Sequence, residues 1–269
     1  MAFNLRLPQG GKIAYEVTGS GPALILVSGL GGRGAFWRPL VSELAQSFTV
    51  VTYDHLATGR SSRVSGPFSV SGMAADLLCL ISELDLERPT LIGHSTGGAI
   101  LQELALIRSE KVGRLVLSAT WAAPCPYFRA LFASRLAMLD RAGLDEYRRM
   151  GVVLQYPPYW ARDHEELFLN EMEAPPPANL ELETEIVRAR IAAVLAHDRL
   201  ADLPKISAPT LVVTAADDMI VPAYHSETLA REIPGAGLAM LPRGGHFVPR
   251  TEPRAYVDAL IPFLTETAS

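Results

Sequence analysis

The sequence has few of the features that mark several large classes of protein. Only two cysteines, Cys79 and Cys125, occur in 269 residues. They stand in unlike contexts, so we expect two free thiols and neither a disulfide framework nor a zinc site. No run of Lys and Arg appears and the net charge is −5, which argues against nucleic acid and anionic membrane as partners.

Long apolar runs are missing as well. No segment approaches the roughly 18 apolar residues that a membrane helix needs, and the first residues contain no apolar signal segment. There is also no internal repeat and no low-complexity stretch. With 49% hydrophobic and 20% charged residues, the composition is that of a globular protein. We therefore expect a cytoplasmic protein without a membrane partner, large enough for one α/β domain with an insertion.

Short apolar runs typical of buried strands alternate with longer helical patterns in the first part of the chain. The expected strands are 12–19, 23–29, 48–54, 89–95 and 114–120, and the expected helices are 36–47, 69–84 and 99–107. Continuous apolar strands separated by helices indicate a mostly parallel sheet that is covered on both faces.

The alternation stops at Trp121 and resumes near Leu203. Between them lie helical patterns at 128–139, 144–154 and 183–196, separated by the Pro-rich joints YPPYW and APPPAN. After them, strands are expected at 208–218 and 237–241, and helices at 224–233 and 254–264. The pattern predicts a core of residues 1–120 and 204–269 and a helical cap of residues 121–203, inserted where open α/β sheets bind ligands.

The stretch LIGHSTGGAI places a serine between glycines where a predicted strand becomes a helix. Residues 93–97, Gly-His-Ser-Thr-Gly, fit the pattern G-x-S-x-G, in which a sharp turn lifts the serine hydroxyl above the sheet. The positive end of the following helix is directed at the same place. An ordinary glycine-rich turn also fits this pattern, so a nucleophilic Ser95 requires partners elsewhere in the chain.

A serine becomes a good nucleophile when a histidine removes its proton and a carboxylate orients that histidine. After an elbow of this kind, the carboxylate and then the histidine follow along the chain in loops after strands. Asp217 and Asp218 end a predicted strand, and His246 stands behind two glycines after the last one. The sequence thus predicts a triad of Ser95, one of these two aspartates, and His246, because no other histidine completes this order.

The oxyanion formed by such an attack needs N–H donors that are held in place. The residue after the nucleophile, Thr96, is expected to supply one, and the stretch GLGGRG, with Leu30 best placed, the other. That stretch also fits a flexible turn, whereas a phosphate loop is disfavoured because it lacks the Lys-Ser/Thr pair. No cluster of metal-ligating side chains is visible, so we expect no metal and no cofactor.

Together these residues resemble the α/β-hydrolase superfamily over nearly the whole chain. The fold implied is a mostly parallel sheet of about eight strands flanked by helices, with an inserted helical cap. Within the superfamily, the chain resembles the group that contains 3-oxoadipate enol-lactonases and the aminoacrylate hydrolases of pyrimidine degradation. The aminoacrylate hydrolases are suggested by the segments SGLGGRGAFW, YPPYW, ADDMIVP and GGH. By resemblance to hydrolases that carry Asp-x-x-x-Pro, the triad acid is Asp218, followed by Pro222.

Two segments depart from the pattern of most relatives. Their oxyanion loop begins with His-Gly, whereas this chain has Ser28 and Gly29. The loop after the strand 48–54 reads DHLATGRSS where most relatives have Asp-x-Arg-Gly-x-Gly-x-Ser, so that His55 and Ala57 change the pattern. The second departure affects the packing of that loop and leaves the predicted triad intact.

The reaction implied is acyl transfer to water through an acyl-enzyme on Ser95. The expected substrate is a small ester, lactone, amide or carbamate in a pocket between core and cap. Arginines at 33, 129 and 148 are candidates for a substrate carboxylate, although each also fits a solvated surface. The full set of candidate substrate contacts is Arg33, Trp121, Tyr127, Tyr156, Trp160 and Phe247; for the aromatic ones, packing within the cap is an equal alternative.

Other functions fit the same triad. One is carbon–carbon bond hydrolysis or cofactor-free perhydrolysis, which product analysis would distinguish, as would a pocket with two carboxylate-binding ends. Another is a hydrolase-fold receptor, for which slow single turnover with retained product would be diagnostic. The expected partner is a small-molecule substrate, and a homodimer is compatible with the sequence.

Overall fold

The computed structural model describes residues 2–173 and 175–266. Its strands form one 8-stranded sheet in the order β1-β2-β4-β3-β5-β6-β7-β8. β2 is antiparallel to both of its neighbours, and all pairs from β4 onward in this order are parallel. The strands are β1 (Ala2–Arg6), β2 (Lys12–Thr18), β3 (Ala23–Val27), β4 (Thr49–Tyr53), β5 (Thr90–His94), β6 (Arg114–Ser118), β7 (Thr210–Ala215) and β8 (Gly237–Leu241). The predicted mostly parallel sheet is confirmed.

Helices connect the parallel strands. Those that flank the sheet are α1 (Arg38–Leu44), α2 (Val70–Glu83), α3 (Thr96–Ile107), α9 (Tyr224–Glu232), α10 (Val248–Thr251) and α11 (Pro253–Thr265), with the short 3-10 turns η1 (Gly34–Trp37), η2 (Ser109–Lys111) and η3 (Leu200–Lys205). Between β6 and β7 lie α4 (Pro126–Ala142), α5 (Leu144–Gln155), α6 (Pro158–Asp163), α7 (Glu165–Met172) and α8 (Leu180–Ala196). We call α4–α8 the cap helices.

Three elements differ from the sequence-based expectation. β1 was not predicted, because only Leu5 of its residues is buried and the strand lies at the edge of the sheet. Helices α6 and α7 occupy a region where the sequence predicts only a Pro-rich joint. Helix α6 begins with Pro158 at its first position, where proline is well tolerated because that N–H has no partner within the helix.

Each central strand buries both of its faces. Along β3, Ile25 and Val27 pack on the side of α2 and α3, whereas Leu24 and Leu26 pack on the side of α1 and α11. This alternation follows from the two-residue period of a strand. It explains why the strands read as continuous apolar runs rather than as alternating ones.

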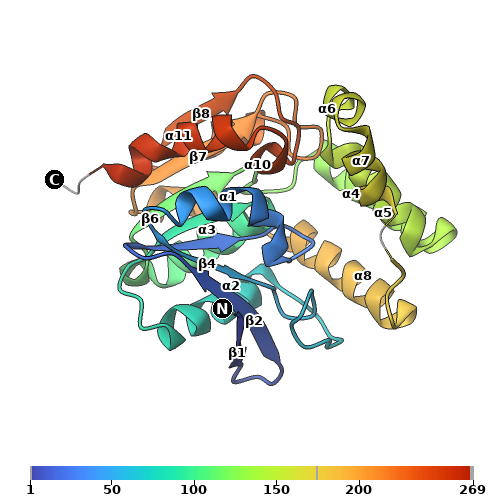
Figure 1. Cartoon of the computed structure of the whole chain (residues 1–269), viewed down its shortest axis with the longest axis horizontal. Helices are drawn as coiled ribbons and strands as arrows, with labels where there is room; N and C mark the ends of the chain where they lie inside the picture. Colours follow the sequence, from blue (N-terminus) through green and yellow to red (C-terminus); the bar gives the residue numbers. More distant parts are fainter. Residues whose placement is uncertain (1, 174, 267–269) are drawn as a thin grey trace.

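The cap helices gather at one side of the sheet, across the molecule from the chain's C-terminus (Figure 1). They are not a separate hydrophobic unit, because Phe128, Phe132 and Ile191 belong to the same buried cluster as the sheet residues. A smaller aromatic cluster around Tyr156 and Trp160 holds α5, α6 and α7 together. The cap is therefore packed firmly against the carboxyl edge of the sheet.

Two further expectations concern single features of the chain. Cys79 and Cys125 are both free and partly buried, as predicted. No helix in the described part of the chain is long and apolar enough to span a membrane.

The first prediction concerns the close approach of α3 to β3. A β-carbon on Gly97 would lie 2.1 Å from the Val27 carbonyl oxygen. We expect Gly97→Ala to lower the free energy of unfolding by about 3 kcal/mol, because backbone has to move to relieve the contact. The control is Gly31→Ala, since an added β-carbon there meets nothing within 4 Å. Urea unfolding followed by circular dichroism measures both, and equal stability of the two variants would contradict the argument.

Candidate active site

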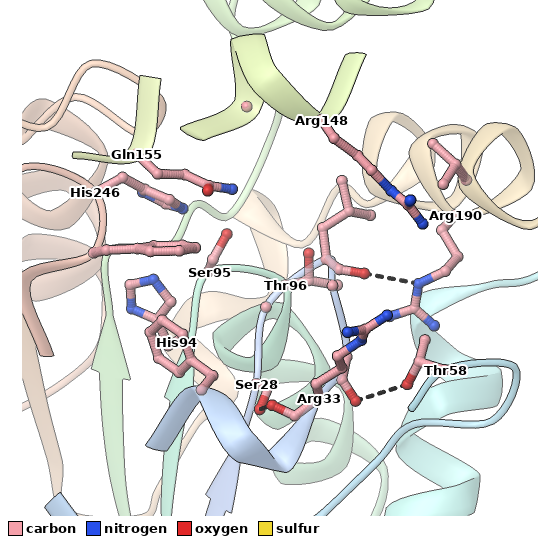
Figure 2. A pocket seen from close by; sticks show the side chains of 18 of the residues that line it. Ser28, Arg33, Thr58, His94, Ser95, Thr96, Arg148, Gln155, Arg190 and His246 are labelled. Atoms are coloured by element: carbon pink, nitrogen blue, oxygen red, sulfur yellow. Dashed lines mark hydrogen bonds between the residues drawn. The ribbon is translucent and has the colours of Figure 1, made fainter. Parts of the chain in front are cut away.

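The three residues predicted as a triad come from three loops at one edge of the sheet. Ser95 lies between β5 and α3, Asp218 follows β7, and His246 lies between β8 and α10. Because β5, β7 and β8 belong to the parallel part of the sheet, their carboxyl ends meet at the same edge. Ser95 and His246 line one cavity, and the His246 ring is turned toward the Ser95 side chain (Figure 2).

Ser95 has an unusual backbone conformation. Its φ of 55° and ψ of −120° lie in a region that non-glycine residues rarely adopt and that costs about 1–3 kcal/mol. Hydrogen bonds on both sides hold it: the Ser95 amide donates to the Ser118 carbonyl at 2.8 Å, and its carbonyl accepts from Gly98 at 2.9 Å. This backbone conformation directs the Ser95 side chain away from the sheet and into the cavity, as the elbow pattern predicts.

Asp218 orients His246. The imidazole Nδ1 donates to Asp218 Oδ2 at 2.8 Å, and both side chains are almost completely buried. The other carboxylate oxygen, Oδ1, accepts from the amides of Ile220 at 2.8 Å and Val221 at 2.9 Å. In this hydrogen bond the proton stays on Nδ1. Nε2 of a neutral His246 therefore has a free lone pair and can act as a base.

Asp217 has a different task from its neighbour. Its Oδ1 accepts a hydrogen bond from the Gly245 amide at 2.8 Å. Gly245 immediately precedes His246, so Asp217 fixes the loop that carries the histidine without contacting the ring. The two adjacent aspartates that the sequence left in competition thus have separate partners.

His94 lies beneath the elbow. Its ring stacks on Phe36 with centroids 4.8 Å apart and lies 4.9 Å from the ring of His246. Its Nδ1 is 3.3 Å from the Ser118 hydroxyl. Burial, and secondly the neighbouring His246, hold the pKa of His94 well below the usual 6.5, so this ring remains neutral and supports the floor of the site.

Two amides predicted as oxyanion donors border the same cavity as Ser95. They belong to Leu30, after β3, and to Thr96, at the first position of α3. Among the residues that the structure describes, neither amide donates to a protein acceptor. Both N–H groups are therefore available to a ligand beside the Ser95 hydroxyl.

Side chains from three elements hold the glycine-rich loop after β3. The Ser28 hydroxyl donates to the Arg33 carbonyl, and the Thr58 hydroxyl donates to the Gly32 carbonyl, each at 2.8 Å. At Leu30 the restraint comes from the cap, because Arg190 Nε donates to the Leu30 carbonyl at 2.9 Å (Figure 2). Ser28, one of the two departures noted in the sequence, thus helps to hold the loop in shape.

Arg190 is buried without an ion pair to any described residue. It is 2% exposed, and its Nη2 lies 3.0 Å from His55 Nδ1. Because the guanidinium only donates, His55 accepts, and burial followed by the charge of Arg190 keeps the pKa of His55 well below 6.5. Burial lowers the pKa of Arg190 to about 10, so it stays charged at neutral pH. His55, one of the residues that change the expected pattern of this loop, is therefore the hydrogen-bond acceptor for Arg190.

The cavity has a volume of about 540 Å³, within the range of small-molecule sites. Arginines dominate its charged lining. Among the described residues, seven arginines but only two carboxylates line it: Arg33, Arg38, Arg63, Arg135, Arg148, Arg190 and Arg250 against Glu171 and Glu183. The two carboxylates are already engaged. Glu171 pairs with Arg250 at 2.6 Å, and Glu183 lies 3.5 Å from Arg63 and 3.7 Å from Arg148.

Three of the predicted substrate contacts line this cavity. Trp121 and Phe247 lie at its wall with their side chains largely buried, and Arg33 is exposed at its rim. Of the other two arginines considered, Arg148 lines the cavity and Arg129 is exposed outside it.

The remaining aromatic candidates do not line the cavity. Tyr156 and Trp160 stack on each other with centroids 4.5 Å apart inside the cap. Tyr127 is 43% exposed, and its hydroxyl donates to the Met219 carbonyl at 2.5 Å. These side chains pack the cap and its junction with the core, which was the alternative that the sequence left open.

Among the lining residues that sequence reasoning missed are Arg135, Tyr147, Gln155 and Arg190. All four come from the cap helices. The Gln155 side chain reaches toward Ser95 and His246 (Figure 2), and the backbone carbonyl of Gln155 accepts from the Phe247 amide at 3.1 Å. The cap is thus bonded both to the oxyanion loop, through Arg190, and to the loop of His246.

Comparison with known proteins identifies the family of the chain. A family model of the alpha/beta hydrolase fold matches residues 22–253. A Caulobacter segnis protein named "Putative carbamate hydrolase RutD" is 37% identical over 262 residues, covering 94% of this chain and 96% of that protein. An Agrobacterium fabrum protein of the same name is 36% identical over 255 residues, covering 93% and 97%.

Solved structures give the same fold. A hydrolase from Pseudomonas aeruginosa superimposes with a TM-score of 0.88 at 29% identity, covering 98% of each chain. The enol-lactonase from Burkholderia xenovorans superimposes with a TM-score of 0.87 at 22% identity, covering 98% of this chain and 100% of that one. The chain therefore belongs to the α/β-hydrolase fold family, and it is a hydrolase.

Proposed function

We propose that the protein hydrolyses a small, negatively charged carbamate, ester, lactone or amide through an acyl-enzyme on Ser95. The observation that carries this proposal is one cavity in which Ser95 and the His246–Asp218 pair face a lining rich in arginine. The names of the relatives support a carbamate or a similar C–N compound as the substrate. The sequence resemblance to aminoacrylate hydrolases and enol-lactonases supports a short carboxylic acid.

The first half of the reaction forms the acyl-enzyme. His246 Nε2 takes the Ser95 proton as the hydroxyl oxygen attacks the substrate carbonyl, and the carbonyl oxygen becomes an oxyanion. The amides of Leu30 and Thr96 donate to that oxyanion. His246 then gives its proton to the leaving nitrogen or oxygen, and the bond to the leaving group breaks.

The second half repeats these steps with water. His246 removes a proton from a water molecule, which attacks the acyl carbon, and the collapsing intermediate releases the acid and returns the proton to Ser95. Asp218 stabilises the imidazolium that forms in each half. Because His94 is held neutral beside His246, the positive charge on the catalytic ring meets no second imidazolium.

The charge of the cavity supports an anionic substrate. A buried guanidinium is costly unless an anion compensates it, and carboxylates are the anions that arginine binds best through two hydrogen bonds. Arg190 and Arg135 are buried in the cavity wall without a carboxylate partner among the described residues. A negatively charged substrate supplies what these side chains lack.

Covalent labelling tests the nucleophile. A small fluorophosphonate is expected to modify Ser95 stoichiometrically, as located by mass spectrometry, and to abolish hydrolysis of p-nitrophenyl acetate. Ser95→Ala should show neither labelling nor hydrolysis. If the wild-type protein is folded by circular dichroism yet takes up no label, Ser95 is not activated and the receptor hypothesis replaces this one.

The two neighbouring aspartates give a matched pair of variants. We expect Asp218→Asn to lower kcat about 1,000-fold or more, because the amide disfavours the His246 tautomer that serves as base. Asp217→Asn keeps an oxygen that accepts from Gly245, so its kcat should fall less than about tenfold. Steady-state hydrolysis of p-nitrophenyl acetate measures both, and similar losses would contradict the separate roles.

Arg190 is expected to act through the oxyanion loop. The glycines beside Leu30 make the backbone of this loop flexible. Arg190 restrains it by donating a hydrogen bond to the Leu30 carbonyl. With neutral p-nitrophenyl acetate, Arg190→Met should lower kcat about tenfold with little change in KM, because oxyanion contacts form only in the transition state. The control is Arg188→Met, on the same helix, whose side chain is 51% exposed. A loss confined to anionic substrates would show that Arg190 binds charge and does not position the loop.

A further inference from the structure

Arg135 is the most unusual charged side chain of the cap. It is 7% exposed and lines the same cavity as Ser95. Its guanidinium makes no hydrogen bond and no ion pair with any residue that the structure describes, and Nε is fully enclosed without a partner. A guanidinium has five N–H donors. Because Nε is enclosed, the four N–H groups on Nη1 and Nη2 are left for a molecule that the protein itself does not supply.

Aromatic rings hold this guanidinium in place. It lies over the ring of Tyr147, 4.5 Å from the centroid, and 5.4 Å from that of Phe132. Both rings also line the cavity. Contacts with ring faces restrain an arginine without consuming its N–H groups, so the side chain is fixed while its hydrogen-bonding capacity stays free.

Helix α5 makes room for the same group. Gly151 lies inside this helix, and a β-carbon there would be 3.2 Å from Arg135 Nη2. Glycine inside a helix is less favourable than alanine. The less favourable glycine thus stands at the helix position where a larger side chain would crowd the Arg135 guanidinium.

A second buried arginine, Arg190, lines the same cavity. Tyr147 feels both charges, because Arg135 and then Arg190 lower its pKa against the larger rise caused by burial. The three residues come from three cap helices, α4, α5 and α8. The two carboxylates of the cavity are paired with other arginines, so neither compensates Arg135.

From these contacts we infer that Arg135, held over Tyr147, forms a carboxylate subsite in the cap wall of the cavity, which Arg190 also lines. The inference rests on the proposed function only in taking the bound anion to be part of the substrate cleaved at Ser95. The substrate then has its scissile carbonyl at the core side of the cavity and its carboxylate at the cap side. Exposed Arg33, at the rim, is not needed for this contact.

The subsite also sets a minimum length for the substrate. A cavity of about 540 Å³ is far larger than an acid of a few heavy atoms requires. A molecule that reaches from Ser95 to the cap wall needs a chain between its two polar ends. The geometry thus favours half-derivatives of dicarboxylic acids, with one end cleavable and the other ionised.

Equilibrium binding to the Ser95→Ala protein tests this directly, because no probe is turned over. The probes are the monomethyl esters of straight-chain dicarboxylic acids from succinate to suberate, each compared with its uncharged dimethyl ester by isothermal titration calorimetry. At one chain length the monoester should bind about tenfold tighter than the diester or better. Adding Arg135→Met should remove that preference, whereas adding Arg141→Met, at an exposed position of the same helix, should leave it intact.

Two further measurements separate this subsite from a general effect on folding. Arg135→Met removes an unpaired buried charge and keeps the hydrocarbon stem, so its thermal midpoint should equal or exceed that of the parent protein. Gly151→Ala, which improves the helix but crowds Nη2, should weaken monoester binding and leave diester binding unchanged.

Equal affinity of monoesters and diesters at every length, or a preference that survives Arg135→Met, would overturn the inference. The proposed function is judged separately, by Ser95 labelling and p-nitrophenyl acetate hydrolysis in the wild-type protein. Arg135-dependent binding without either reaction would leave the subsite standing and refute the hydrolytic role of Ser95.

Discussion

The site depends on how closely backbone can approach backbone at the elbow. Helix α3 begins against the end of β3, where Gly97 leaves no room for a β-carbon beside the Val27 carbonyl. On the other side, a β-carbon on Gly29 would lie 3.1 Å from that of Ser95. With both glycines in place, the strained serine and the oxyanion loop touch. Every chemical step proposed for this protein needs that contact, because the nucleophile and the N–H donors must act on one carbonyl group.

Core and cap contribute different kinds of group. The core supplies the serine, the histidine and the aspartate from loops at the carboxyl edge of the sheet. The buried, unpaired positive charges come from cap helices, through Arg135 and Arg190. They stand in a protein whose net charge is −5, so the cavity has the opposite sign from the molecule as a whole. Reaction chemistry and selection by charge are thus encoded in separate segments of the chain.

The fold and the Ser–Asp–His order could be predicted because their signals are local: apolar runs, an elbow pattern, and polar residues just after strands. The cap contacts could not, because they depend on how helices pack. Even so, Arg190 stands with Val187, Ile191 and Val194 on one helical stripe, and Arg135 with Phe132 and Leu139. An arginine on the apolar face of a helix is the signal that was available. What it could not give is the partner, since Leu30 is 160 residues from Arg190 in the chain and Tyr147 lies on a different helix from Arg135.

The bond from Arg190 to the Leu30 carbonyl also constrains how the molecule can move. Lifting α8 from the core would break this bond and free the loop that carries an oxyanion donor. With α8 lifted, only the Ser28 and Thr58 hydroxyls would still hold the glycine-rich loop. Under the proposed mechanism, a small molecule that entered by displacing α8 would therefore meet a loop that Arg190 no longer holds. The hydrogen bond that holds the loop in place thus also links the position of α8 to the shape of the site.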